Sequence, residues 1–224
     1  MRFFLDTASI DDIKFWQPYG VVNGVTTNPK LLSNEDEDPL IRLKKITSIV
    51  NGPVSAEVTY NTHNEMISQG KGFSKISDNI VVKVPATTEG ILAAKELVEN
   101  EIACNVTLTF DPSQAIPFCT LPVNYVSLIL GRIEDFGQRD DLERTIQLRN
   151  IIDQLQSTTK LLSASIRNSA QLKSAIIGKS DVVTIPPNTW MNIYQNSHTL
   201  LGEKDFLEAW KTLPKTLREE YETI

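Results

Sequence analysis

A single lysine stands inside one of the most apolar stretches of the chain. Lys83 lies in "NIVVKVPATTEG" (79–90), between three β-branched residues and Val84. A run that is apolar on both faces indicates a buried strand, and a buried ammonium is costly unless it is paired or neutralised. Because burial disfavours the charged form, a neutral amine here could attack a ketone and form a Schiff base. The alternative interpretation is a buried ion pair between Lys83 and either Glu57 or Asp6.

The two carboxylates that could accompany this lysine lie on other apolar runs. Asp6 ends "RFFLD" and Glu57 lies in "VSAEVT" (54–59). A protonated Schiff base is an electron sink, so it stabilises the carbanion left when a neighbouring carbon–carbon bond breaks. Carboxylates can move the protons that such a cleavage requires. These residues predict chemistry at a carbon–carbon bond next to a ketone.

Two arginines follow later apolar runs, each near an expected helix start. Arg132 lies in "GRIED" (131–135), and Arg167 follows Ser165 in "SASIRN" (163–168). A guanidinium binds phosphate through a charge-assisted fork, and helix N-termini also favour anions. Either arginine alone is interpreted as a surface salt bridge. Together with Ser165 they indicate a phosphate pocket, so a sugar phosphate is the expected substrate.

The elements that must position these residues alternate along the chain. Helix-start patterns such as "THNE" (62–65) and "DPSQ" (111–114), together with "NP" (28–29), "DDLE" (140–143) and "NSAQ" (168–171), fill most gaps between apolar β-branched runs. This alternation predicts an α/β fold, a (β/α)8 TIM barrel. An open doubly wound sheet is the alternative, but no glycine-rich loop follows the first run. The eight expected strands are 2–7, 20–28, 54–59, 80–85, 102–110, 124–130, 160–166 and 181–186.

Polar residues near the ends of these runs form one candidate set. The C-terminal ends of the strands carry the site in such barrels, so these side chains should converge. A cluster of this kind is costly for a core and useful for catalysis. Besides the residues above, the set contains Thr26, Thr27, Asn28, Asn105, Thr107, Ser127 and Thr184.

The overall composition excludes several classes of function. The chain has 224 residues and a formal net charge of −6, which argues against non-specific binding to nucleic acid or acidic membranes. Its two cysteines, Cys104 and Cys119, are isolated and predict reduced thiols in a cytoplasmic protein. The N-terminus lacks the apolar run of a signal peptide, and no stretch is long enough for a transmembrane helix.

The C-terminal segment follows the eighth expected strand and is not needed to complete a barrel of eight β/α units. We expect one barrel domain over 1–224, in which 203–224 forms an amphipathic helical tail that Pro214 kinks or divides. The apolar side chains of this tail need a surface, either on their own barrel or on a neighbouring subunit. They include Phe206, Leu207, Trp210 and Leu213.

Several motifs, in order and spacing, resemble one known family. From "FFLDTA" to about residue 187 the chain is similar to the transaldolases, in size to the small single-domain subgroup that includes fructose-6-phosphate aldolase. The motifs are "GVTTNP" (24–29), "VVKVPATTEG" (81–90), "CNVTLTF" (104–110), "GRIED" (131–135) and "SASIRN" (163–168).

The resemblance implies a (β/α)8 barrel with a Schiff-base lysine at Lys83 and an acid/base at Asp6 that deprotonates the C4 hydroxyl. It implies a catalytic water held by Glu57 and Thr107, with no metal or organic cofactor. It also implies a homo-oligomer, often a decamer, with the C-terminal helix on a neighbour. The implied substrate-binding residues are Asn28, Asn105 and Ser127 for the dihydroxyacetone moiety, Arg132, Ser165 and Arg167 for the phosphate, and Thr26 of the "GVTTNP" motif.

Two activities share this family, and three features separate them. Aldolases of the small subgroup carry glutamine at the Glu57 position, tyrosine near Ile129 and "GTAVY"-like text at 105–110, so this chain resembles the transaldolases. The expected reaction moves dihydroxyacetone from sedoheptulose 7-phosphate to glyceraldehyde 3-phosphate. Fructose-6-phosphate aldolase and a non-catalytic sugar-phosphate-binding barrel are the alternatives. Lys30 and Ile129 depart from the family pattern, which carries serine and an aromatic residue there.

Overall fold

The computed structural model describes residues 1–137 and 140–223. Within them, eight parallel strands follow one another around a closed barrel, and β1 pairs with β8 to complete it. The prediction of a (β/α)8 barrel is therefore confirmed, and the open sheet is excluded. The strands are β1 (Arg2–Asp6), β2 (Val25–Thr26), β3 (Val54–Glu57), β4 (Ile80–Pro85), β5 (Cys104–Thr109), β6 (Tyr125–Ile129), β7 (Lys160–Ala164) and β8 (Val182–Ile185).

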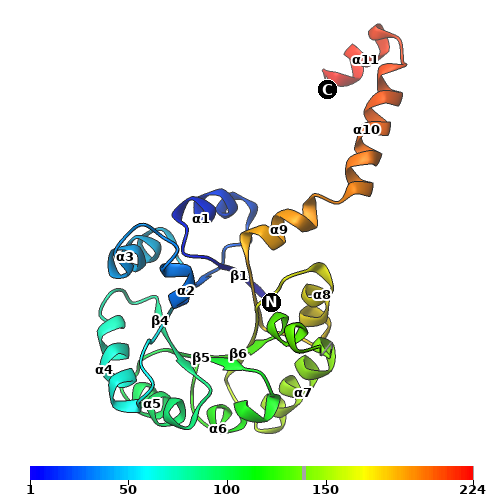
Figure 1. Cartoon of the computed structure of the whole chain (residues 1–224). Coiled ribbons are helices and arrows are strands. Elements are labelled where there is room, and N and C mark those ends of the chain that lie inside the picture. Colours follow the sequence, from blue (N-terminus) through cyan, green and yellow to red (C-terminus); the bar gives the residue numbers. More distant parts are fainter. Residues whose placement is uncertain (138–139, 224) are drawn as a thin grey trace. The chain divides into compact units, whose positions relative to one another are not determined.

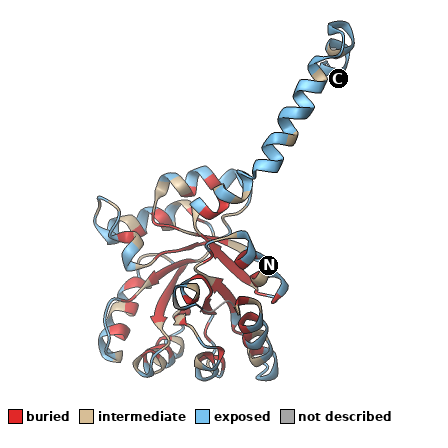
Figure 2. Cartoon of the chain, turned by 45° about the vertical axis from the view of Figure 1, so that its right-hand side comes forward, coloured by how far each residue is buried: buried red, intermediate tan, exposed pale blue. Residues whose placement is uncertain are grey.

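Helices surround this barrel, and the ring of strands lies inside them (Figure 1). The strands are mostly buried, whereas the helices alternate buried and exposed residues, as amphipathic helices on a barrel should (Figure 2). The helical elements are α1 (Ile10–Trp16), η1 (Gln17–Tyr19), α2 (Pro29–Leu32), α3 (Pro39–Ile49), α4 (His63–Phe73), α5 (Thr88–Glu99), η2 (Pro112–Ala115), α6 (Ile116–Cys119), η3 (Gly131–Phe136), α7 (Asp141–Gln154) and α8 (Ser169–Ile177).

Side-chain caps begin several helices where the sequence predicts them. The Oδ1 atom of Asn28 accepts from the Leu31 backbone N–H at 3.0 Å, and that of Asn168 accepts from Gln171 at 2.9 Å. Asp111 forms a capping box, although the helical turn it begins is a short 3-10 turn. Thr62 differs, because its hydroxyl donates to the Glu65 carboxylate and caps no backbone group.

The second strand is much shorter than the predicted 20–28. Regular pairing is confined to Val25–Thr26. Asn23 bonds Phe3 twice, donating from its backbone N–H to the Phe3 carbonyl at 2.8 Å and accepting the Phe3 N–H on its side chain at 3.0 Å. Because a side-chain amide takes the place of a backbone carbonyl, the chain before Gly24 lies beside β1 without forming a strand.

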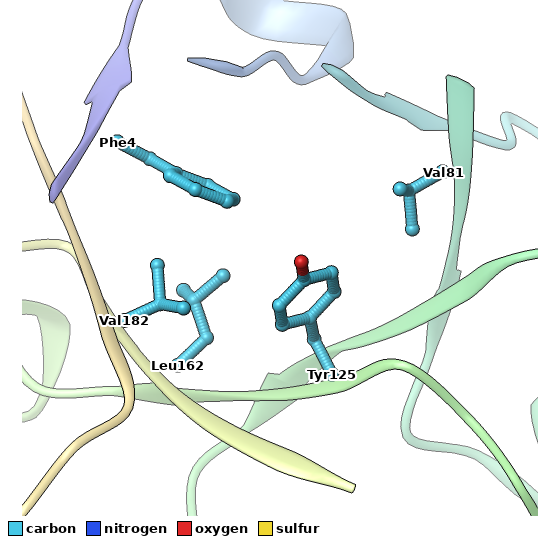
Figure 3. Close-up of a cluster of buried hydrophobic side chains, with 5 residues drawn as sticks. All are labelled: Phe4, Val81, Tyr125, Leu162 and Val182. Atoms are coloured by element: carbon cyan, nitrogen blue, oxygen red, sulfur yellow. The ribbon is translucent and has the colours of Figure 1, made fainter. Parts of the chain in front are cut away.

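An apolar layer fills the barrel interior. Phe4, Val81, Tyr125, Leu162 and Val182 are buried and project inward from five strands toward one another (Figure 3). The rings of Phe4 and Tyr125 meet edge to face with centroids 5.9 Å apart, a favourable geometry for aromatic pairs. This layer closes the barrel below the polar ends of the strands. The interior is therefore a packed core, and any cavity at the C-terminal ends of the strands is bounded below by this layer.

A second compact unit begins at Trp190 and contains most of α9 (Pro187–Tyr194), together with α10 (Ser197–Lys211) and α11 (Lys215–Glu222). The predicted division at Pro214 is confirmed, since α10 ends before it and α11 begins after it. Within this unit Trp210 donates from Nε1 to Glu222 at 2.9 Å and packs its ring on Tyr221. Phe206 is 78% exposed, so the contacts within this unit leave most of its apolar surface uncovered.

Two further observations concern the cysteines and the length of the helices. Cys104 and Cys119 are both buried and free of disulfides, as predicted. Among the described residues, we find no helix with the length and apolarity needed to cross a membrane.

Candidate active site

The site stands directly on the apolar layer of the barrel. Successive side chains of a strand alternate between its two faces, so a residue two positions after an inward-facing one also faces inward. On four strands this step leads from an apolar side chain of the layer to a polar one above it. The pairs are Phe4 and Asp6, Val81 and Lys83, Tyr125 and Ser127, and Val182 and Thr184.

A cavity of about 420 Å³ opens at this end of the barrel. Its volume is that of a small-molecule site. The wall contains eleven of the thirteen residues of the candidate set. These eleven are Asp6, Thr26, Asn28, Glu57, Lys83, Thr107, Ser127, Arg132, Ser165, Arg167 and Thr184.

Lys83 lies at the floor of the cavity and is only 7% exposed. Its Nζ atom is 2.9 Å from Oε2 of Glu57 and donates to the Thr27 carbonyl oxygen at 3.0 Å. Glu57 and Lys83 are register partners on β3 and β4, so the ladder itself places the two side chains together. The ion pair considered as the alternative for Lys83 is present, and it also gives the amine a proton acceptor within direct reach.

Asp6 is a second carboxylate on the same cavity. Its Oδ1 atom accepts from the Thr26 hydroxyl at 2.7 Å. Burial raises the pKa of Asp6 above its ordinary value, while Lys83 and the Thr26 hydrogen bond act in the opposite direction. A carboxyl whose pKa is raised in this way is suited to accept and return a proton during a reaction.

Two residues of the candidate set, Asn105 and Thr27, do not line the cavity. Asn105 is fully buried, accepts from the Ser127 hydroxyl at 2.7 Å and donates to Ser55 Oγ at 3.1 Å. Its side chain therefore lies behind Ser127 and holds the Ser127 hydroxyl in place. Any role of Asn105 toward a ligand is indirect in this arrangement.

The two arginines and Ser165 all line the cavity. Ser165 has a φ of +61°, a left-handed conformation that is uncommon outside glycine and concentrates at functional sites. The Gly131 N–H donates to the Ser165 carbonyl at 2.9 Å, and a Cβ at Gly131 would lie only 2.1 Å from that oxygen. Glycine therefore allows the turn that carries Arg132 to lie against Ser165.

Arg167 is held by a carboxylate on that same turn. Its Nη1 and Nη2 atoms donate to the two oxygens of Asp135 at 2.6 and 2.8 Å. This fork lowers the pKa of Asp135 and raises that of Arg167. The salt bridge considered for a single arginine is thus realised for Arg167, which nevertheless lines the cavity, as Arg132 does.

Two structural supports of the site were missed by the sequence reasoning. Leu108 has a φ of +58°, and the β5–β6 register shifts between Val106 and Thr109, which produces a bulge directly after Thr107. Nothing in the residue type of Leu108 signals this conformation.

Arg144 is the other missed support. It is 5% exposed and donates from Nη1 to the carbonyls of Phe110 and Ile129, at 3.0 and 3.1 Å. Its Nε and Nη2 atoms bond Asp140 and Asp141, so one guanidinium ties the ends of β5 and β6 to α7. The three- and four-residue spacing of "DDLER" could have indicated the ion pairs, but not the carbonyl contacts.

The cavity thus combines a buried amine, two carboxylates, several hydroxyls and a cationic rim. Such a set can attack a carbonyl, move protons and bind an anionic substrate group. Among the described residues, no three His, Cys, Asp or Glu side chains are grouped to hold a metal ion.

Comparisons with known proteins give a consistent result. The family model described as transaldolase/fructose-6-phosphate aldolase matches residues 3–222. A probable transaldolase of Geotalea uraniireducens is 43% identical over 216 residues, covering 96% of this chain and 100% of that protein. A probable transaldolase of Lactiplantibacillus plantarum is 39% identical, covering 96% of this chain and 99% of the other.

Solved structures are similar in fold alone. The carboxyl transferase domain of Rhizobium etli pyruvate carboxylase, solved with 3-bromopyruvate, superposes with a TM-score of 0.59 at 12% identity. The match covers 83% of this chain and 40% of that one. It indicates the barrel and carries no argument about activity.

Proposed function

The chain belongs to the transaldolase/fructose-6-phosphate aldolase family, and from this premise we propose that it is a transaldolase of the pentose phosphate pathway. It moves a dihydroxyacetone unit from sedoheptulose 7-phosphate to glyceraldehyde 3-phosphate and so forms erythrose 4-phosphate and fructose 6-phosphate. The observation that carries the proposal is the buried Lys83 amine, 2.9 Å from Glu57 at the floor of a cavity with a cationic rim.

The reaction begins when Lys83 becomes a nucleophile. Glu57 takes a proton from the ammonium, and the neutral amine attacks C2 of the ketose. Loss of the C2 oxygen as water leaves an iminium between Nζ and C2. The pairing of Glu57 with Lys83 supports this step, because the proton moves only along an existing contact.

Cleavage then breaks the bond between C3 and C4. The Asp6 carboxylate takes the proton of the C4 hydroxyl, the C4–O bond becomes a carbonyl, and the electrons of the C3–C4 bond enter the iminium to give an enamine. The aldose leaves, and glyceraldehyde 3-phosphate enters. C3 of the enamine attacks its carbonyl carbon, Asp6 returns the proton to the new hydroxyl, and water releases the ketose from Lys83.

Binding of the substrate divides between two ends of the cavity. Asn28 and Ser127 hold the dihydroxyacetone end, and Asn105 orients Ser127 through their hydrogen bond. The charge-assisted contacts of Arg132 and Arg167, with the Ser165 hydroxyl, hold the phosphate. The convergence of all these side chains on one cavity except Asn105, which lies behind it, supports these assignments.

A transaldolase must keep the three-carbon unit on the lysine until an acceptor arrives. Glu57 and Thr107 position the water that would otherwise release it, and both border the cavity. The aliphatic side chain of Ile129 forms part of the same wall. Ile129 itself carries no hydroxyl that could protonate the enamine.

The setting of the enzyme follows from the same features. We place it in the cytoplasm, where two buried free thiols stay reduced. We also expect a homo-oligomer, because the contacts within the C-terminal unit leave the apolar side chains of α10 and α11 exposed.

The proposal is tested by two assays on one preparation. The first follows transfer from fructose 6-phosphate to erythrose 4-phosphate, and the second follows net synthesis of fructose 6-phosphate from free dihydroxyacetone and glyceraldehyde 3-phosphate. We expect efficient transfer and slow net synthesis. Net synthesis faster than transfer would instead assign the chain to the aldolases, and inactivity in both would indicate a binding protein.

A further inference from the structure

A hydroxyl on β8 enters the site without a role in the reaction above. The Thr184 Oγ1 atom lies 2.6 Å from Thr26 Oγ1, which itself lies 2.7 Å from Asp6 Oδ1. Thr184 is 2% exposed and borders the cavity, so its hydroxyl is isolated from bulk water. The three side chains form one continuous chain of hydrogen bonds.

We propose that Thr184 is a positioning residue, whose hydroxyl donates to Thr26 and thereby fixes the Thr26 proton on the Asp6 carboxylate. The role in catalysis rests on the proposed function, in which Asp6 accepts and returns the C4 proton. The hydrogen-bond chain itself does not depend on that function.

The donor and the acceptor of each hydrogen bond between Thr184, Thr26 and Asp6 follow from counting protons. A threonine hydroxyl has one proton to donate, whereas an ionised carboxylate only accepts. Both contacts of Thr26 are short enough to be hydrogen bonds, so its proton goes to Asp6 and the proton between the two threonines must come from Thr184. Thr184 therefore decides which way the Thr26 hydroxyl points.

The barrel topology places the donors on both sides of Asp6. β1 lies between β2 and β8 in the sheet, and the hydroxyls of Thr26 and Thr184 meet across it inside the barrel. The register pairs Asp6 with Thr26 and Phe4 with Thr184. The rest of the charge around Asp6 comes from Glu57 on β3, Lys83 on β4 and Arg132 after β6.

Loss of the Thr184 hydroxyl should affect the ionised form of Asp6 more than the neutral form. The bond to a carboxylate is charge-assisted, and a second hydroxyl in line polarises and strengthens it. Without Thr184, the Thr26 hydroxyl is free to turn and accept a proton from a neutral Asp6. The Thr184→Val substitution should therefore raise the pKa of Asp6 by about half a unit.

Direct titration of the Asp6 carboxyl tests the hydrogen bonds from Thr184 through Thr26 to Asp6 without relying on turnover. Carboxyl ¹³C NMR on the full-length protein, assigned with Asp6→Asn, compares the wild type with Thr184→Val and Thr184→Ser. We expect an upward shift in the valine variant and recovery in the serine variant. Thr109→Val is the matched control, because Thr109 is a fully buried barrel threonine whose hydroxyl has no hydrogen-bond partner among the described residues. An unchanged Asp6 titration in folded Thr184→Val overturns the proposal.

Turnover gives a second, separable readout. In Thr184→Val the acidic limb of the pH profile of kcat should move to higher pH by the same amount as the pKa of Asp6. KM should change little. A rise in KM alone would make Thr184 a substrate contact and overturn the positioning role. If the wild type shows no transfer while the NMR shift is present, the proposed function fails and the hydrogen-bond chain stands.

Discussion

The Lys83 amine lies 2.9 Å from a carboxylate oxygen of Glu57, and the two residues are register partners on adjacent strands. A buried lysine would be costly alone, whereas this pairing compensates its charge and provides a place for its proton. The same contact accounts for both interpretations of Lys83, the ion pair and the nucleophile. Lys83 forms the ion pair in the enzyme before substrate binds. It becomes the nucleophile when Glu57 takes a proton from its ammonium group.

The Glu57→Gln substitution should shift the reaction toward net aldol chemistry. The amide cannot take the Lys83 proton or activate water, so transfer should slow by about 10²–10⁴-fold, the range of general acid–base effects. The ratio of net synthesis to transfer should rise, measured with both assays on one preparation. Glu99→Gln, on the exposed face of α5, is the control and should change neither rate. A ratio that stays constant would contradict the assigned role of Glu57.

The Asp6→Asn substitution should remove turnover and stabilise the fold near neutral pH. Burial raises the pKa of Asp6 in the folded protein above its ordinary value of 3.8. A raised carboxyl pKa gives a stability contribution that is present at low pH and lost as the pH rises through the folded-state pKa. Because asparagine cannot ionise, its gain in free energy of unfolding should be larger at about pH 7 than at about pH 4. Urea denaturation at both pH values measures it, and an equal gain would contradict this sign.

Substitutions in the Arg167–Asp135 pair should change KM for phosphorylated substrates. Arg167→Ala removes a cation and leaves the Asp135 carboxylate unpaired beside the phosphate, so KM for fructose 6-phosphate should rise by about tenfold or more. The double variant with Asp135→Ala removes that repulsion and should recover part of the loss. Steady-state kinetics of the wild type, both single variants and the double variant give the coupling. A double variant worse than Arg167→Ala would show that Asp135 helps to bind substrate.

The Arg144→Met substitution should destabilise the barrel more than a surface change of the same kind. It leaves Asp140, Asp141 and the carbonyls of Phe110 and Ile129 without their shared donor. Loss of one partner of such a buried network costs about 3–5 kcal/mol. Urea denaturation measures the loss.

A matched control for Arg144→Met is Lys95→Met, on the exposed part of α5, which should be nearly neutral. A loss in Arg144→Met no larger than that of this control would contradict the role of Arg144 in tying β5 and β6 to α7.

Much of this architecture could be predicted from local pattern. Eight apolar runs separated by helix-start signals define a barrel, and Asn28, Asp111 and Asn168 cap where their types predict. The predicted strand over 20–28 is too long, because the side-chain oxygen of Asn23 accepts the Phe3 N–H in place of a backbone carbonyl. Competition of this kind between side chain and backbone leaves no mark in hydrophobic periodicity.

The site was predictable as a set of side chains, but not as a geometry. Polar types at strand ends located the cavity wall, since parallel strands bring those ends together. The buried position of Asn105, the left-handed Leu108 and the fork between Arg167 and Asp135 could not be predicted in this way. These depend on contacts between residues distant in sequence, which a single sequence does not encode locally.

Borohydride trapping tests the central claim most directly. The protein is incubated with fructose 6-phosphate and reduced, and the site of the mass increase is located by peptide mapping. We expect one adduct, on Lys83, which is absent in Lys83→Met and retained in Lys30→Met, the other lysine of the cavity wall. Circular dichroism should show that Lys83→Met is folded. Catalytically active protein that gives no adduct, or that carries the adduct on Lys30, would contradict the assignment of Lys83 as the Schiff-base lysine.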